Sequence, residues 1–110
     1  MNNKIYSNKQ EKSVAKALGG RQVRGSGASI FSKGDVSLNR VLVECKTSIS
    51  EKTSYSIKKK ILEKIKDEAR VMGKYFSVLA FNFGPDSQNY YVIDEDTMKY
   101  LAEKIVEDYE

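Results

Sequence analysis

The chain has 110 residues, of which 40% are hydrophobic and 31% charged, and this composition predicts one compact domain over residues 1–110 rather than a disordered segment. It contains no histidine and a single cysteine, Cys45, which excludes histidine-based acid–base catalysis, the usual zinc sites and a disulfide framework. Three possibilities remain: catalysis by a hard cation bound to carboxylates, catalysis by lysine, or binding without catalysis.

The net charge of +4 is distributed unevenly. Residues 1–74 contain 17 basic and 7 acidic residues, whereas residues 75–110 contain 2 basic and 8 acidic ones. The basic part indicates a surface that meets a polyanion such as nucleic acid, and the alternative is an ordinary solvated surface. With no apolar run near the ~20 residues that span a bilayer, and a polar N-terminus, we expect no membrane partner and a cytoplasmic protein of a bacterial, archaeal or phage-infected cell.

The N-terminal part of the chain predicts one helix and one short strand. Small apolar residues at helical spacing predict a helix over residues 8–18, with Asn8 as its N-cap and Gly19-Gly20 after its end. A strand over 21–24 and a loop of glycine and serine over 25–29 should follow.

The central part predicts a β-hairpin. Residues 35–38 and 41–46 are strand-like, and Asn39-Arg40 would form a two-residue turn between them. This register pairs residue 38 with 41, 37 with 42 and 36 with 43. It also places Asp35 directly opposite Glu44, on the face that Lys46 shares.

The C-terminal half predicts two helices and two strands. Apolar residues at helical spacing predict an amphipathic helix over residues 57–72, and the dense apolar run 75–83 is typical of an interior strand. A strand over 90–93 and a helix from Asp94 to about residue 108 complete the chain. The order helix, three strands, helix, two strands, helix predicts an α/β fold with helices flanking a mixed sheet.

The predicted pair of Asp35 and Glu44 carries the chemistry. Two like charges face to face cost stability, and Mg²⁺ or Mn²⁺ between them removes that conflict. The ammonium of Lys46 could hold the attacking water or stabilise a phosphate. The alternative is a solvated strand face with a weak ion pair. Against it, Glu44 follows an almost wholly apolar run, where solvation explains a charge poorly.

These residues also carry a resemblance. Asp35…Glu44-Cys45-Lys46 resembles the PD-(D/E)XK nuclease signature, with Gly34 in place of the usual proline. Glu11, the run 24–28 and Gly34-Asp35-Val36 are similar in type and order to archaeal Holliday junction resolvases and related phage resolvases. The likeness covers about residues 8–83; the loop before Asp35 is short, and the C-terminal strand and helix match no family pattern.

The resemblance implies a restriction-endonuclease-like fold, with an α-β-β-β-α-β core plus a C-terminal strand and helix. It further implies a homodimeric endonuclease that hydrolyses branched, four-way DNA in recombination or repair, using Mg²⁺ with Mn²⁺ able to substitute. Asp35 and Glu44 would bind the metal, Lys46 would orient water, and Glu11 would complete the metal site. Ser26 would contact DNA near the scissile phosphate.

Several of these roles have competing explanations. Asn8 and Glu11 also fit a helix-capping pair, and Ser26 could serve only the turn. Cys45 should be a packing residue. The further candidates for DNA contact are basic: Arg24, Lys33, Lys58, Lys59 and Lys60. Two other functions stay open: a module of the same fold that binds nucleic acid without cutting it, and a repair or restriction nuclease that does not require a junction.

Overall fold

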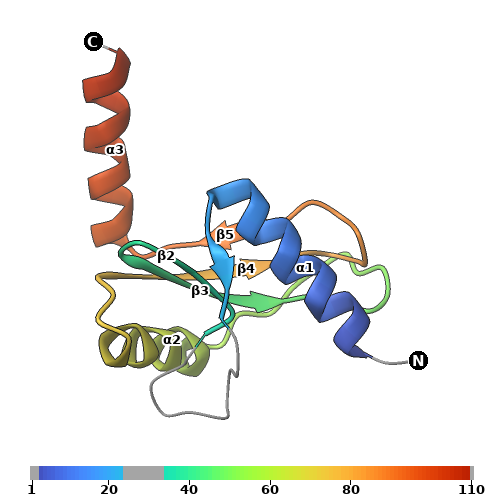
Figure 1. Ribbon diagram of the computed structural model, residues 1–110. Helices are drawn as coiled ribbons and strands as arrows, with labels where there is room; N and C mark the ends of the chain where they lie inside the picture. The colour runs from blue at the N-terminus through green and yellow to red at the C-terminus, as the bar shows by residue number, and fades with distance from the viewer. Residues whose placement is uncertain (1–2, 24–33, 110) are drawn as a thin grey trace.

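The computed structural model describes residues 3–23 and 34–109 of the chain. Within these ranges the elements follow the predicted succession of helices and strands (Figure 1). They are α1 (Asn3–Leu18), β1 (Arg21–Gln22), β2 (Val36–Leu38), β3 (Val41–Lys46), α2 (Lys59–Val71), β4 (Phe76–Phe81), β5 (Tyr90–Val92) and α3 (Glu95–Tyr109). The predicted α/β class is therefore confirmed.

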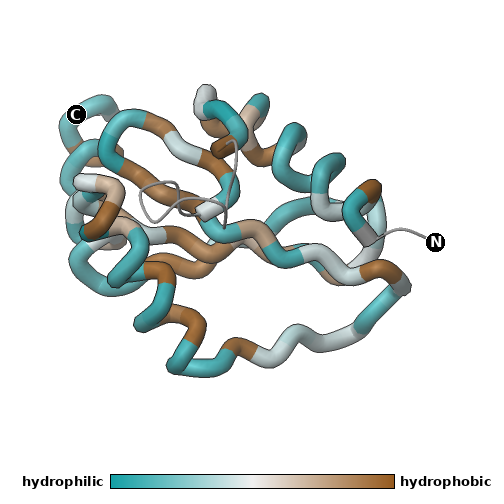
Figure 2. The backbone as a smooth tube through the Cα atoms, turned by 60° about the horizontal axis from the view of Figure 1, so that its bottom comes forward, coloured by the Kyte–Doolittle hydropathy of each residue, from teal (hydrophilic) through white to brown (hydrophobic). Residues whose placement is uncertain are grey.

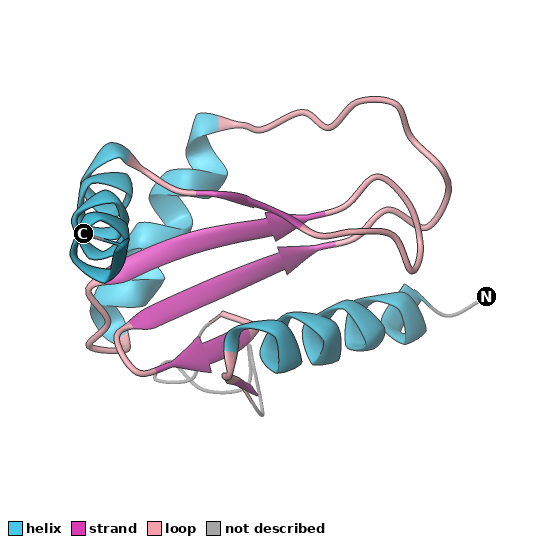
Figure 3. Cartoon of the chain, turned by 90° about the horizontal axis from the view of Figure 1, so that it is seen from above, coloured by secondary structure: helices cyan, strands magenta, loops and turns pink. Residues whose placement is uncertain are grey.

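The strands form one mixed sheet in the order β1-β2-β3-β4-β5, as the cartoon seen from above makes plain (Figure 3). β3 and β4 are parallel, and every other neighbouring pair is antiparallel. Parallel neighbours need a crossover connection, and α2 supplies it between β3 and β4. The interior position predicted for the apolar run that becomes β4 is confirmed, because β3 and β5 flank it.

Helices α1 and α2 cover opposite faces of the sheet. Val43 packs in a buried cluster with Val14 of α1, whereas its neighbour Glu44 reaches Lys64 of α2. Adjacent strand residues point to opposite faces, so the two helices lie on different sides. Both faces are buried, and the hydrophobic colour of the central strands in Figure 2 reflects this. The buried apolar residues are Val14, Val36, Leu42, Val43, Ile65, Ala69, Val78, Leu79 and Ala80.

The helix boundaries differ from the predicted ones, and the differences have local causes. α1 begins at Asn3, five residues before Asn8, because the preceding residues contain nothing that interrupts a helix. α2 begins at Lys59, and Lys58 at its N-cap offers no capping oxygen. The final helix begins at Glu95, where the carboxylate of Asp94 accepts the backbone N–H of Thr97 at 2.9 Å, a typical N-cap bond.

Helix α3 stands away from the rest of the molecule (Figure 1). Within the described residues its first turns contact the body, through buried Thr97 and through Tyr100, whose ring lies 5.2 Å from that of Phe76. Across residues 3–23 and 34–109 the helices are all too short or too polar to cross a lipid bilayer.

Candidate active site

The hairpin that carries the candidate site has the predicted turn and most of the predicted register. Val36 pairs with Val43, Ser37 with Leu42, and Leu38 with Val41, which leaves Asn39-Arg40 as the two loop residues. Asn39 has a φ of 26°, and asparagine tolerates this left-handed region better than most residues. The turn type and the alternation of strand residues therefore determined this part of the site.

The fourth predicted pair, Asp35 opposite Glu44, is not part of the ladder, so this detail of the prediction is wrong. The backbone N–H of Asp35 donates to the carbonyl of Val43 at 3.0 Å, although Val43 already pairs with Val36. Asp35, just before β2, and Val36, its first residue, thus both face Val43 of β3. This is the arrangement of a β-bulge, and it changes the direction of the Asp35 side chain. The Asp35 carboxylate then accepts the backbone N–H of Cys45 at 2.7 Å.

The backbone at Gly34, next to the bulge, explains why proline does not occupy this position. Its φ is +76°, a value that the ring of proline forbids. A Cβ at this position would lie 2.6 Å from the side chain of Leu42, which is fully buried. The departure from the usual proline is therefore a requirement of this backbone.

Glu44 is a buried carboxylate in an unfavourable position. Its side chain is 10% exposed, and the ammonium groups of Lys46 and Lys64 lie 3.7 and 3.8 Å from its Oε1, beyond hydrogen-bond distance. Burial, and after it the negative charge of Asp35, raise the pKa of Glu44, and Lys64 and Lys46 oppose the shift; the net result is a pKa of about 7. The carboxylate therefore lacks a strong partner among the described residues.

A side chain of α1 fixes the backbone of Lys46. Gln10 of α1, which is 5% exposed, donates its Nε2 to the carbonyl of Lys46 at 2.9 Å. The same amide nitrogen lies 3.2 Å from Oδ1 of Asn89 and 3.4 Å from the carbonyl of Ala80. Gln10 thus ties α1 to the ends of β3 and β4, and the Lys46 side chain remains half exposed beside Glu44.

Glu11 lies on α1 at the side of Asp35. Burial raises its pKa, a hydrogen bond from Gln22 at 3.2 Å lowers it, and the charge of Asp35 raises it. Its alternative role as a capping residue is wrong, because Asn8 lies inside α1 and accepts a hydrogen bond from Gln22 at 2.9 Å. Glu11 therefore remains a candidate ligand near Asp35.

Three contributors were missed by sequence reasoning. Lys64 contacts Glu44 from α2, and Glu68 pairs with Lys64 at 3.5 Å across one helical turn. Gln10 supports Lys46 from α1. An i, i+4 Lys–Glu pair was visible in the sequence, but nothing local indicates that it faces β3. Gln10 could have been noticed as a polar residue on the buried side of a helix, four positions before Val14.

The remaining candidates divide into three groups. Arg24, Ser26 and Lys33 lie outside the described residues. Lys58, Lys59 and Lys60 are exposed at the start of α2. Cys45 packs against the α1-side core as predicted, and burial raises the pKa of its thiol, which the charges of Asp35, Glu11 and Glu44 raise further. A thiol in such surroundings is not a nucleophile at neutral pH.

The acidic side chains around β3 are the oxygen donors available to a metal ion. Over residues 3–23 and 34–109, no three side chains of the His, Cys, Asp and Glu types converge to hold a metal. Asp35 and Glu44 are nevertheless hard oxygen donors, and the charge of Asp35 raises the pKa of Glu44. Mg²⁺ commonly takes only one or two carboxylates, with water and substrate phosphate as its other ligands. The pair fits a hard divalent cation, with Glu11 beside it.

Comparisons of the chain with models of protein families, with curated proteins and with solved structures gave no match. The geometry and charge of the site are therefore the basis on which its function can be inferred.

Proposed function

We propose that the protein is a metal-dependent DNA endonuclease of the PD-(D/E)XK type, with a restriction-endonuclease-like arrangement of α1 to β4. The observation that carries the proposal is the buried carboxylate of Glu44, close to Asp35 and beside the ammonium groups of Lys46 and Lys64. A charge buried at a cost to stability, next to another charge of the same sign, is more often functional than structural.

Each residue of the site has a proposed role. A divalent cation held by Asp35 and Glu44, with Glu11 near, would polarise the phosphate and acidify a bound water. Lys46 would orient that water and stabilise the negative charge that develops on the phosphate. Lys64 favours the ionised form of Glu44 that can bind a cation, because its positive charge lowers the pKa of that carboxyl.

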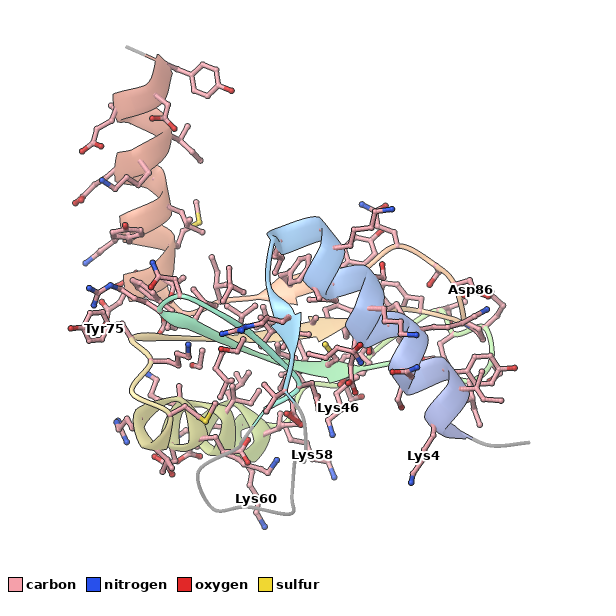
Figure 4. All side chains as sticks on the ribbon, in the orientation of Figure 1. Lys4, Lys46, Lys58, Lys60, Tyr75 and Asp86 are labelled. Carbon is pink, nitrogen blue, oxygen red and sulfur yellow. The ribbon has the colours of Figure 1, made fainter. Side chains whose placement is uncertain are left out.

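The basic surface near the site supports DNA as the substrate. Lys46, Lys58 and Lys60, together with Lys4 of α1, extend on the same side of the molecule (Figure 4). Lys58 and Lys60 are exposed at the start of α2, where they oppose the helix dipole instead of stabilising it. Lysines in this position favour a role in neutralising phosphates.

The preference for a branched substrate follows from the resemblance to junction resolvases. The experiment is a cleavage assay on a synthetic four-way junction, a flap and a linear duplex with Mg²⁺, Mn²⁺ or EDTA. We expect metal-dependent products from wild type, fastest with the junction, and much less product from Lys46→Ala. Salt-sensitive binding without products under any metal would instead identify a non-catalytic binding module. Equal cleavage of all three substrates would indicate a repair or restriction enzyme.

The contribution of the α2 lysines is tested by the salt dependence of binding. Replacing Lys58 and Lys60 by glutamine should make the negative slope of log K against log[salt] shallower by about 2, because each phosphate contact contributes roughly −0.9 to it. Fluorescence anisotropy of a labelled junction between 50 and 200 mM salt measures the slope. The matched control replaces Lys99 and Lys104 of α3, which should leave the slope unchanged. Identical slopes for both double variants would show that Lys58 and Lys60 of α2 do not contact DNA.

A further inference from the structure

Three side chains form a row across the sheet beside the candidate active site. The ladder places Lys46 of β3 opposite Phe81 of β4, and Phe81 opposite Tyr90 of β5. Directly paired residues point to the same face of a sheet, so both rings lie on the face that carries the Lys46 side chain. Neighbouring strands are about 4.8 Å apart, which puts the backbone of Tyr90 roughly 10 Å from that of Lys46. One nucleotide can bridge the two side chains over this distance.

Two further rings complete an aromatic cluster, which consists of Tyr55, Phe81, Phe83 and Tyr90. The rings of Tyr55 and Tyr90 both stack on Phe81, with centroids 4.5 and 5.9 Å from its own. Phe83 meets Phe81 and Tyr90 edge-on, at 5.4 and 5.5 Å. Burial and the negative charge of Glu44 raise the pKa of Tyr55, so this ring lies within electrostatic reach of the proposed metal ligand.

The rings of the aromatic cluster are more exposed than packing alone requires. A small cluster beneath a long loop is often a satellite of the core, and its side chains are then buried. None of these four side chains is buried, and Tyr90 is 46% exposed. The cluster therefore presents aromatic surface to solvent, next to the half-exposed ammonium of Lys46.

The loop that carries Tyr55 is held in place by hydrogen bonds to the segment after β4. The buried side chain of Asn82 accepts the backbone N–H of Ser48 at 3.0 Å. Farther along the loop, the backbone N–H of Lys52 donates to the carbonyl of Phe83 at 2.7 Å. The stacked rings are thus positioned before any ligand arrives, and a preorganised surface loses little conformational entropy on binding.

We infer that the aromatic cluster is a stacking platform for an unpaired base of the nucleic acid whose phosphate contacts Lys46. Every base has a flat π-face, and proteins bind unpaired nucleotides by combining aromatic rings with basic groups that follow the backbone. The exposed side chains of Lys58 and Lys60 extend on the same side of the molecule as Lys46 (Figure 4). These positive charges favour a polyanion over an apolar peptide as the occupant.

The inference rests on the proposed function and narrows its substrate. The DNA would have at least one unpaired nucleotide beside the phosphate that is cut, because a paired base has both faces covered by its neighbours in the duplex. A four-way junction can supply such a nucleotide at its crossover.

The first test measures binding by the wild-type chain in EDTA, so its result does not depend on cleavage. One DNA is a fully paired duplex, and the other has the same length and number of phosphates but a central bubble of four non-complementary pairs. We expect the bubble to bind at least about fivefold more tightly, since each stacked base contributes that factor or more. A 2-aminopurine in the bubble should lose fluorescence as it stacks. Equal affinity for the two DNAs overturns the inference.

The second test removes the most exposed ring of the cluster. Tyr90→Leu should weaken binding of the bubble by about fivefold or more and leave the paired duplex unaffected, whereas Tyr90→Phe should behave as wild type. The slope of log K against log[salt] should stay the same, because no phosphate contact is lost. The matched control is Tyr109→Leu, at a tyrosine that is 88% exposed near the end of α3.

The outcomes separate this inference from the nuclease proposal. Wild-type binding of the bubble by Tyr90→Leu overturns the platform, even if the wild type cleaves DNA. So does an equal loss for both DNAs, because a structural role of Tyr90 would then explain it. A protein that shows the expected stacking but yields no products with Mg²⁺ or Mn²⁺ would contradict the nuclease proposal alone.

Discussion

We expect the Asp35→Asn variant to cleave DNA about 1,000-fold more slowly than wild type under saturating Mg²⁺. The amide keeps an oxygen that can accept the backbone N–H of Cys45, so the bulge at the end of β2 should persist. It removes the negative charge that a divalent cation needs in this pair of carboxylates. A loss of about 4 kcal/mol of transition-state stabilisation corresponds to that factor, since each tenfold change is about 1.36 kcal/mol.

The measurement is the single-turnover rate on a labelled four-way junction. The matched control is Asp86→Asn, the same substitution at an exposed aspartate that pairs with Lys9 at 3.3 Å. It should cleave at the wild-type rate. Binding of the junction in EDTA should be unaffected by Asp35→Asn, which separates a loss of chemistry from a loss of affinity. A variant that retains wild-type cleavage would exclude Asp35 from the metal site.

The second large effect concerns Glu44 and the pH dependence of stability. Burial and the neighbouring charge of Asp35 raise the pKa of Glu44 from 4.5 to about 7, so the folded state keeps the proton to a higher pH than the unfolded chain. The contribution of Glu44 to the free energy of unfolding is therefore highest below pH 4.5, falls between pH 4.5 and 7, and then levels off. The shift corresponds to about 3 kcal/mol.

Glu44→Gln removes this contribution. We expect the unfolding free energy of wild type, relative to that of the variant, to fall by about 3 kcal/mol between pH 4 and pH 8 when both are measured by urea denaturation in EDTA. Glu63→Gln, an exposed glutamate on α2, is the matched control and should show no such trend. If the difference in unfolding free energy between wild type and Glu44→Gln does not change with pH, the pKa of Glu44 is the same in the folded and unfolded states and the proposed shift is absent.

The same experiment with Mg²⁺ examines the metal site directly. At pH 8, Mg²⁺ at 100 times its Kd should raise the free energy of unfolding of the wild type by about 2.7 kcal/mol, because the cation binds only the folded state. Glu44→Gln should gain little. Equal stabilisation of both proteins by Mg²⁺ would contradict a role for Glu44 as a ligand, whatever the cleavage assay shows.

Local patterns were sufficient for the elements and for part of the site. The alternation of apolar residues along β3 and the two residues Asn39-Arg40 specify a hairpin and its register, since a slip by one residue would move Leu42 and Val43 to the wrong faces. Helical spacing located α2, and Asp94 marked the start of α3. The proximity of Asp35, Glu44 and Lys46 follows from these short-range rules.

The sequence by itself thus determined the order of the elements, the mixed α/β architecture and the membership of Asp35, Glu44 and Lys46 in one neighbourhood. Only the structure revealed that Asp35 leaves the ladder, where its N–H donates to the carbonyl of Val43 and its carboxylate accepts the N–H of Cys45. It also brought Gln10 to the backbone of Lys46, 36 residues away, and Lys64 to Glu44. These contacts join different elements, and packing between elements has no periodic signature in a single chain.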